Sequence, residues 1–171
     1  QKNIGEFFKI SSGGMQDTLL PGDRLLAVKF GYRNGDRLPR RGDIVIFQYK
    51  DKKDKGRMQV KRCAALPGET LEIRGKTLRI GNRPVPVPPT ANFESSRFAS
   101  GPPPRNYQYG PVMVGKDEVF MLGDARHQSA DSRNYGCVPV SNVFGRARVI
   151  YFSWDSEARR IRWERIGMKL E

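Results

Sequence analysis

One lysine in this sequence stands among apolar neighbours, where its amine could act as a base. Lys61 follows Val60 and lies two residues before the run Cys-Ala-Ala-Leu at 63–66. Burial among such residues disfavours the ammonium form and lowers the pKa of a lysine, and only a neutral amine can accept a proton. A neutral lysine can activate a serine hydroxyl, which is a weak nucleophile until a base takes its proton. The alternative is a solvated lysine at a strand edge.

Candidate hydroxyls lie in two loops rich in Gly and Ser, at Ser12 and Ser129, where serine also serves as an ordinary turn residue. A Ser/His mechanism would need His127, the single histidine. It lies two residues from Ser129 and four from Asp131. The members of a catalytic triad normally converge from separate segments, so we interpret His127 as a surface-loop residue.

The elements that must position these side chains are predicted to be mainly β-strands, because short apolar runs bounded by turn residues dominate and helical periodicity is scarce. Asn-Gly-Asp at 34–36 indicates a turn, 51–57 reads as a charged loop, and 141–144 as one helical turn. The strands are predicted at 24–30, 43–49, 58–65, 70–73, 77–80, 118–122, 146–154 and 159–165.

A change of composition divides the chain. Residues 83–111 hold eight of the twelve prolines and are predicted to be irregular. A chain of 171 residues suits one domain carrying a smaller insertion. We therefore predict antiparallel sheets that form one core from residues 1–69 and 113–171, with a hairpin and proline-rich subdomain inserted at 70–112.

The net charge of +13 and the pI near 10.1 indicate an anionic partner. Nucleic acid and anionic lipid both attract basic surfaces. The sequence lacks the aromatic-basic, zinc-finger and helix-turn-helix signals of nucleic-acid-binding domains, so no nucleic acid is expected. Cys63 and Cys137 form no CxxC pair, and both a disulfide and two free thiols stay open. No metal or cofactor is predicted.

Four segments, in order, resemble the type I signal peptidase family. Ser-Gly-Gly-Met-Gln-Asp-Thr-Leu at 12–19 is similar to its Ser-Gly-Ser-Met-x-Pro-Thr-Leu segment, and Arg-Gly-Asp-Ile-Val at 41–45 to a strand that follows it. The segment at 60–69, with Val-Lys-Arg and Leu-Pro-Gly-Glu, resembles the one that bears the catalytic lysine. Gly-Asp and Ser-Ala-Asp-Ser-Arg within 123–136 resemble the last signature. Each segment alone is a weak match, whereas the ordered set is specific.

The resemblance implies a signal-peptidase-like β fold and a Ser/Lys mechanism. Lys61 would be the general base, and the hydroxyl of Ser129 would orient its amine. The hydroxyl of Ser12 and the backbone N–H at position 14 would stabilise the oxyanion. Asp124, Asp131 and Arg133 would support the site, and the last two are expected to form an ion pair that braces the loop.

This chain departs from the family at the nucleophile, where glycine, Gly14, replaces serine. Glycine cannot form an acyl-enzyme, so the chain is expected to be inactive as given. Three explanations compete: deliberate replacement, a natural non-catalytic homologue, or a takeover by a neighbouring serine, which would displace the attacking oxygen beyond catalytic tolerance. Further departures lie at Ser11, Asp17, Ala125 and His127.

The implied substrates are signal peptides of secreted preproteins, which are cut after small residues. The peptide would add as a strand beside Ser11 and Gly13. Its small side chains would enter pockets formed by Ile10, Met15, Leu19 and Ala130; the alternative for the first three is ordinary core packing.

The implied location is the bacterial cytoplasmic membrane, with the catalytic domain on the extracytoplasmic side and the anchor outside this chain, since no apolar stretch is long enough to span a bilayer. The basic surface would face anionic lipid, aided by exposed aromatic residues such as Phe7 and Phe8 or Trp154 and Trp163; the alternative for the two tryptophans is core packing. The alternatives are a non-catalytic signal-peptide-binding homologue and a basic nucleic-acid-binding β-domain. A repressor-type Ser/Lys autoprotease would carry a helical DNA-binding domain, which the sequence lacks.

Overall fold

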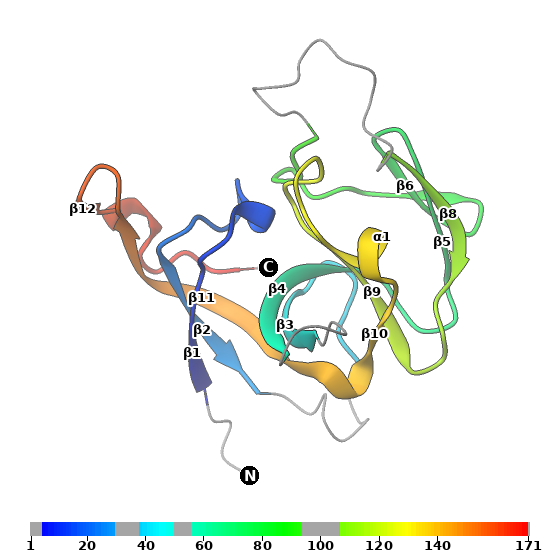
Figure 1. Ribbon diagram of the computed structural model, residues 1–171, viewed down its shortest axis with the longest axis horizontal. Coiled ribbons are helices and arrows are strands. Elements are labelled where there is room, and N and C mark those ends of the chain that lie inside the picture. Colours follow the sequence, from blue (N-terminus) through cyan, green and yellow to red (C-terminus); the bar gives the residue numbers. More distant parts are fainter. Residues whose placement is uncertain (1–4, 30–37, 50–55, 94–106, 171) are drawn as a thin grey trace.

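The computed structural model describes residues 5–29, 38–49, 56–93 and 107–170, which fold into two antiparallel sheets (Figure 1). The larger sheet has the order β1-β2-β11-β3-β4-β9-β10, with β12 paired to β11. Its strands are β1 (Gly5–Lys9), β2 (Asp23–Val28), β3 (Ile44–Tyr49), β4 (Arg57–Ala65), β9 (Glu118–Leu122), β10 (Val138–Pro139), β11 (Val143–Asp155) and β12 (Arg160–Ile161).

The central strands of the large sheet are apolar on both faces. In β3, Ile44 and Ile46 pack into one core cluster while Val45 and Phe47 pack into another, because successive side chains of a strand point to opposite faces. Strand β11 pairs with both β2 and β3 and shows register shifts along its length. Such bulges increase the local twist, which lets one long strand serve two neighbours.

The smaller sheet has the order β7-β6-β5-β8, drawn in green to yellow-green in Figure 1. Its strands are β5 (Thr70–Arg74), β6 (Thr77–Ile80), β7 (Arg83–Val85) and β8 (Gln108–Met113). Leu71 and Leu78 share a buried cluster with Phe120 and Leu122 of the large sheet. The two sheets are therefore joined by a common apolar core.

The prediction of a mainly antiparallel β fold is confirmed. The hairpin predicted at 70–80 forms, and Gly75 has the positive φ of 59° that its turn requires. The strand predicted at 159–165 is wrong: pairing ends after Ile161, and the 3-10 turn η5 (Trp163–Arg165) follows.

The sequence analysis also missed strands. Strand β1 had no expected counterpart, and β7 and β8 lie in the segment 83–111 that was predicted to be irregular. The small sheet runs from Thr70 to Met113, against the insertion predicted at 70–112, and the domain division itself stays a prediction. The predicted turn at 34–36 lies outside the described residues.

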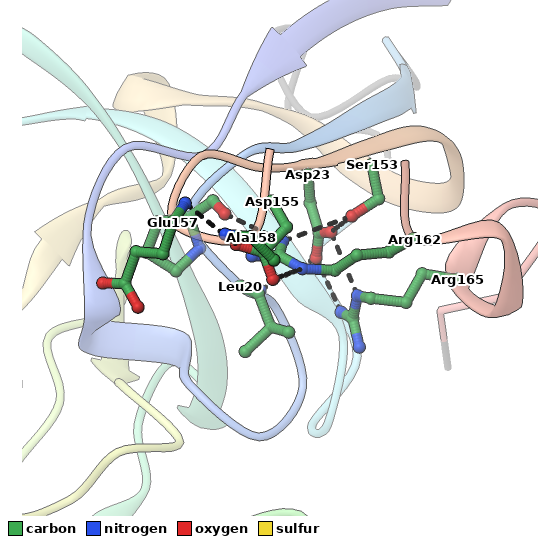
Figure 2. A network of polar contacts seen from close by, with 9 residues as sticks. Leu20, Asp23, Ser153, Asp155, Glu157, Ala158, Arg162 and Arg165 are labelled. Atoms are coloured by element: carbon green, nitrogen blue, oxygen red, sulfur yellow. Dashed lines mark hydrogen bonds and ion pairs between the residues drawn. The ribbon is translucent and has the colours of Figure 1, made fainter. Parts of the chain in front are cut away.

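A buried carboxylate fastens the C-terminal segment to the start of β2 (Figure 2). Asp23 is fully buried and accepts hydrogen bonds from Ser153 Oγ at 2.6 Å and from the Leu20 N–H at 2.8 Å. Arg165 of η5 donates to both Asp23 oxygens, at 3.0 and 2.6 Å, and also to the Thr18 carbonyl at 2.9 Å. The residues after β11 thus hold the loop that leads from η1 into β2.

We expect Asp23→Ala to lower the free energy of unfolding by about 3 kcal/mol, because it leaves the largely buried Arg165 guanidinium without its carboxylate. Urea denaturation measures the change. Glu6→Ala is the control: it removes a half-exposed ion pair with Lys29 and should cost at most about 1 kcal/mol. Equal losses in the two variants would contradict the role given to Asp23.

Candidate active site

The structure brings Lys61 and Ser129 together from distant parts of the chain. Lys61 lies in β4 and is 5% exposed, and Ser129, in the loop after β9, is 3% exposed. The Lys61 Nζ donates to Ser129 Oγ over 3.0 Å. The pair proposed from the resemblance is therefore close enough for the hydroxyl to orient the amine.

The environment of Lys61 favours its neutral form. Burial lowers the pKa of Lys61 below its ordinary value of 10.5, and Arg133 lowers it further. Asp131 and Asp124 oppose this effect, but desolvation is the largest contribution. A lysine with a lowered pKa loses its proton at a lower pH than an ordinary lysine, which suits the role of a general base.

Gly14 lies directly against this amine, within the 3-10 turn η1 (Gly13–Met15). A Cβ built on Gly14 would lie 2.6 Å from Lys61 Nζ and 3.5 Å from Ser129 Oγ. The amine thus occupies part of the space that a side chain at position 14 would take. Since it is the end of a flexible side chain, a small displacement would let a serine at 14 hydrogen-bond to it.

Gly123 is a steric requirement of the site that could not be recognised from the sequence. A Cβ at this position would overlap Ser129 Oγ and the carbonyl oxygen of Gly14. The backbone of β9 can therefore approach both site segments only because residue 123 lacks a side chain. The signal in the sequence is the Gly-Asp pair at 123–124, which resembles a family motif but does not by itself reveal this steric constraint.

Asp124 is fully buried and joins three segments of the site. It accepts from Arg62 Nε at 2.9 Å and Arg62 Nη2 at 2.7 Å, and from Thr18 Oγ1 at 2.5 Å. Arg62 also donates to the Gly42 carbonyl at 2.7 Å. Because Lys61 and Arg62 are adjacent in β4, this ion pair positions the strand that carries Lys61 relative to the loop after η1.

The predicted ion pair of Asp131 and Arg133 is present at 2.8 Å. Asp131 also caps the helical turn α1 (Ser132–Tyr135) and accepts from the Gly123 N–H at 2.9 Å. Ser132 adds a contact that sequence reasoning missed, since its hydroxyl accepts from the Met121 N–H at 2.9 Å. These bonds hold the loop that carries Ser129 against β9.

Ser12, the predicted oxyanion donor, is exposed and caps η1 without a side-chain hydrogen bond to it. In a 3-10 turn that begins at Gly13, the first internal bond is from the Gln16 N–H to the Gly13 carbonyl, at 2.9 Å. The N–H of Gly14 therefore has no acceptor within the turn. Both groups assigned to the oxyanion hole lie at the same turn.

The residues predicted to bind substrate divide into two groups. Ser11 and Ala130 are exposed and Gly13 is half-buried; Ala130 follows Ser129 in the sequence, and Gly13 begins the η1 turn. Ile10, Met15 and Leu19 are buried in the core cluster of β2, β3 and β11. Their side chains pack as core, and their role as pocket walls stays a prediction.

His127 does not join a triad in the structure. It is half-buried, and its Nδ1 has no hydrogen-bond partner among the described residues. The neighbouring Gln128 does contact the η1 turn, donating to Gln16 Oε1 at 3.1 Å and to the Gly13 carbonyl at 3.4 Å. Cys63 and Cys137 are free thiols. In the described ranges, no group of three or more His, Cys, Asp or Glu side chains could hold a metal ion.

No helix among the described residues combines the length and apolar composition needed to cross a bilayer. Residues 2–154 match the family model described as signal peptidase, peptidase S26. A signal peptidase I from Leptolyngbya laminosa is 34% identical over 154 residues, which are 87% of this chain and 70% of that protein. A signal peptidase I from Bacillus licheniformis is 32% identical over 151 residues, 88% of this chain and 78% of that protein.

A solved signal peptidase I from Enterococcus faecalis is 30% identical, with a TM-score of 0.48, and the match covers 64% of this chain and 97% of that one. The family match spans the η1 turn, β4 and the loop that carries Ser129. The buried lysine, its hydroxyl partner and the ion pairs around them thus lie within the matched region, and this chain belongs to the signal peptidase family S26.

Proposed function

We propose that this chain is the catalytic domain of a signal peptidase I that binds signal peptides of preproteins and, with Gly14 in place of the nucleophile, does not cleave them. One observation carries the proposal. A Cβ built on Gly14 would lie 2.6 Å from the buried Nζ of Lys61, and this amine donates a hydrogen bond to Ser129 Oγ. This geometry suits a serine at position 14, where the chain has glycine.

With serine at position 14, the mechanism follows from this geometry. The neutral amine of Lys61 takes the proton of the serine hydroxyl as its oxygen attacks the peptide carbonyl. The N–H of residue 14 and the Ser12 hydroxyl stabilise the oxyanion. The Lys61 ammonium then returns its proton to the leaving amine, and water, activated by the same lysine, hydrolyses the acyl-enzyme.

The alternative is a natural homologue whose function is only to bind signal peptides. The glycine at position 14 is compatible with such a function, because binding needs no nucleophile. A chain of this kind would keep the groove and lose turnover. Conversion of Gly14 to serine separates the two functions, because a site preserved for chemistry regains cleavage whereas a binding-only site gains nothing.

The membrane surface is the second part of the proposal. Phe7 is 67% and Trp163 72% exposed, and Phe7 stacks edge-on against the exposed Tyr151 with ring centroids 4.8 Å apart. Phe8 packs against the core instead. Exposed aromatic side chains together with a net charge of +13 suit contact with anionic headgroups at the extracytoplasmic face of a bacterial membrane.

Gly14→Ser should raise cleavage of a peptide carrying Ala-x-Ala before the scissile bond by about 10³-fold or more, since loss of a nucleophile costs serine proteases even larger factors. Adding Lys61→Met should return the rate to that of the parent. Lys169→Met, at an exposed lysine, is the matched control and should leave it unchanged. A folded Gly14→Ser chain that binds the peptide without cleaving it would favour the binding homologue.

The cleavage rate of Gly14→Ser should rise with pH along a single acid limb whose midpoint lies below 10.5, because only neutral Lys61 is a base. The free energy of unfolding should change with pH in the same direction as the cleavage rate. Between the lowered folded-state pKa and the unfolded value of 10.5 the unfolded chain holds more protons, so the free energy of unfolding rises with pH. Urea denaturation at several pH values measures this rise, which Lys61→Met should abolish and Lys169→Met should keep.

Trp163→Ser and Phe7→Ser should each weaken cosedimentation with vesicles that contain phosphatidylglycerol by about threefold or more, through the loss of buried aromatic area. Met113→Ser, at an apolar residue of the small sheet that is 73% exposed, is the control and should bind like the parent. Equal weakening by all three substitutions would contradict a specific membrane-facing surface.

A further inference from the structure

A cavity lies against β4 just beyond the catalytic lysine and is distinct from the groove assigned to the signal peptide. Its volume is about 320 Å³, within the lower range for small-ligand sites. Apolar walls come from Leu78 of β6, Val85 of β7 and the following Pro86. Three arginines, Arg41, Arg62 and Arg126, also line it, so an apolar chamber is combined with guanidinium groups.

Two of these arginines are engaged by carboxylates. Arg62 donates to Asp124 and to the Gly42 carbonyl through its three nitrogens. Arg41 is paired with Glu69. Their charges are thus compensated within the chain, and neither requires a ligand.

Arg126 is different. It is 3% exposed, and its Nε has no hydrogen-bond partner in the described part of the chain. Its guanidinium carbon lies over the ring of Phe93, 5.5 Å from the ring centroid. The nearby Asp124 oxygens already accept from Arg62 and Thr18. A buried charge without a hydrogen-bonding counterion is costly and is normally paired.

The backbone holds Arg126 in this place. Its N–H donates to the Asn92 carbonyl at 2.8 Å and to the Asp124 carbonyl at 2.9 Å. Burial lowers the pKa of Arg126 to about 10, and Asp124 offsets only part of the effect. The guanidinium therefore keeps its charge at neutral pH, while its Nε–H lacks an acceptor within the described ranges.

We propose that this cavity binds a small organic carboxylate with an apolar body, whose two oxygens pair with the Arg126 guanidinium. A planar carboxylate fits the donor fork bidentately. One uncompensated positive charge matches a monoanion, and the walls of Leu78, Val85 and Pro86 match an aliphatic body rather than a bare phosphate. Two sources share this chemistry, a free aliphatic acid and the C-terminal carboxylate of an apolar peptide.

Hexanoate is the probe for the free acid, and N-acetyl-leucine the probe for a peptide terminus. Each is titrated into the parent chain while the melting temperature is followed, since a ligand that binds only the folded state raises it. We expect at least one of them to raise it in a saturable way, and the tighter probe identifies the source. Hexanamide, of the same shape without charge, should have no effect.

Arg126→Met should weaken binding of the effective probe at least about tenfold, the value expected for a charge-assisted hydrogen bond. Arg148→Gln, at an exposed arginine, is the matched control and should bind like the parent. Without ligand, Arg126→Met should be at least as stable as the parent, because it removes an unpaired buried charge. Should it fail to fold, Val85→Phe fills the cavity while keeping Arg126 and should also abolish binding.

Three results would overturn the proposal. The first is the absence of any stabilisation of the parent by either carboxylate. The second is undiminished binding by Arg126→Met, or by Val85→Phe where that variant replaces it. The third is inorganic phosphate binding as tightly as the carboxylates, which would make the cavity a general anion site. None of these outcomes depends on cleavage of a signal peptide.

Discussion

The buried Asp124 carboxylate is the constraint on which the candidate site depends. It receives Arg62 from β4 and Thr18 from the segment after η1, and its own position is set by the end of β9. Loss of one partner of such a buried pair leaves a charge without compensation, at a cost of about 3–5 kcal/mol. The ion pair therefore holds together the segments that carry Lys61, Gly14 and Ser129.

Two further features define the chemistry of the site: Lys61 is buried away from water, and the backbone segments around Ser129 approach one another closely. The lowered pKa of Lys61 arises chiefly from its burial, against the opposing charges of Asp131 and Asp124. Gly123 allows the backbones of β9 and η1 to approach Ser129 closely. Gly14, which faces the Lys61 amine, lacks the side-chain oxygen that the proposed Ser/Lys mechanism requires.

The segment after β9 contains both paired and unpaired buried charged groups. Asp124 and Asp131, in the segment after β9, form buried ion pairs with Arg62 and Arg133. Arg126, on the same loop, has no hydrogen-bond partner for its Nε among the described residues, and it lines a cavity with apolar walls. A buried charge of this kind is costly without a hydrogen-bonded counterion, and this cost is the basis on which we propose a carboxylate ligand.

Sequence alone determined the residue types and the order of the segments. Lys61 among apolar neighbours, the Asp131–Arg133 pair, the hairpin at 70–80 and the mainly β class were all predictable, because they depend on local pattern and on ordered motifs. The sequence also showed that residue 14 lacks a nucleophile. These features need no knowledge of which segments meet.

Tertiary structure decided the rest. That Lys61 reaches Ser129, that Gly14 faces the same amine and that Gly123 must lack a side chain next to the Gly14 carbonyl depend on contacts between segments distant in the sequence. Strands β1, β7 and β8 were missed because their edge positions and prolines leave little apolar alternation, and pairing with neighbours supplies what the local sequence lacks. The unpaired Arg126 was likewise invisible, since burial and the absence of a partner are properties of the packed chain.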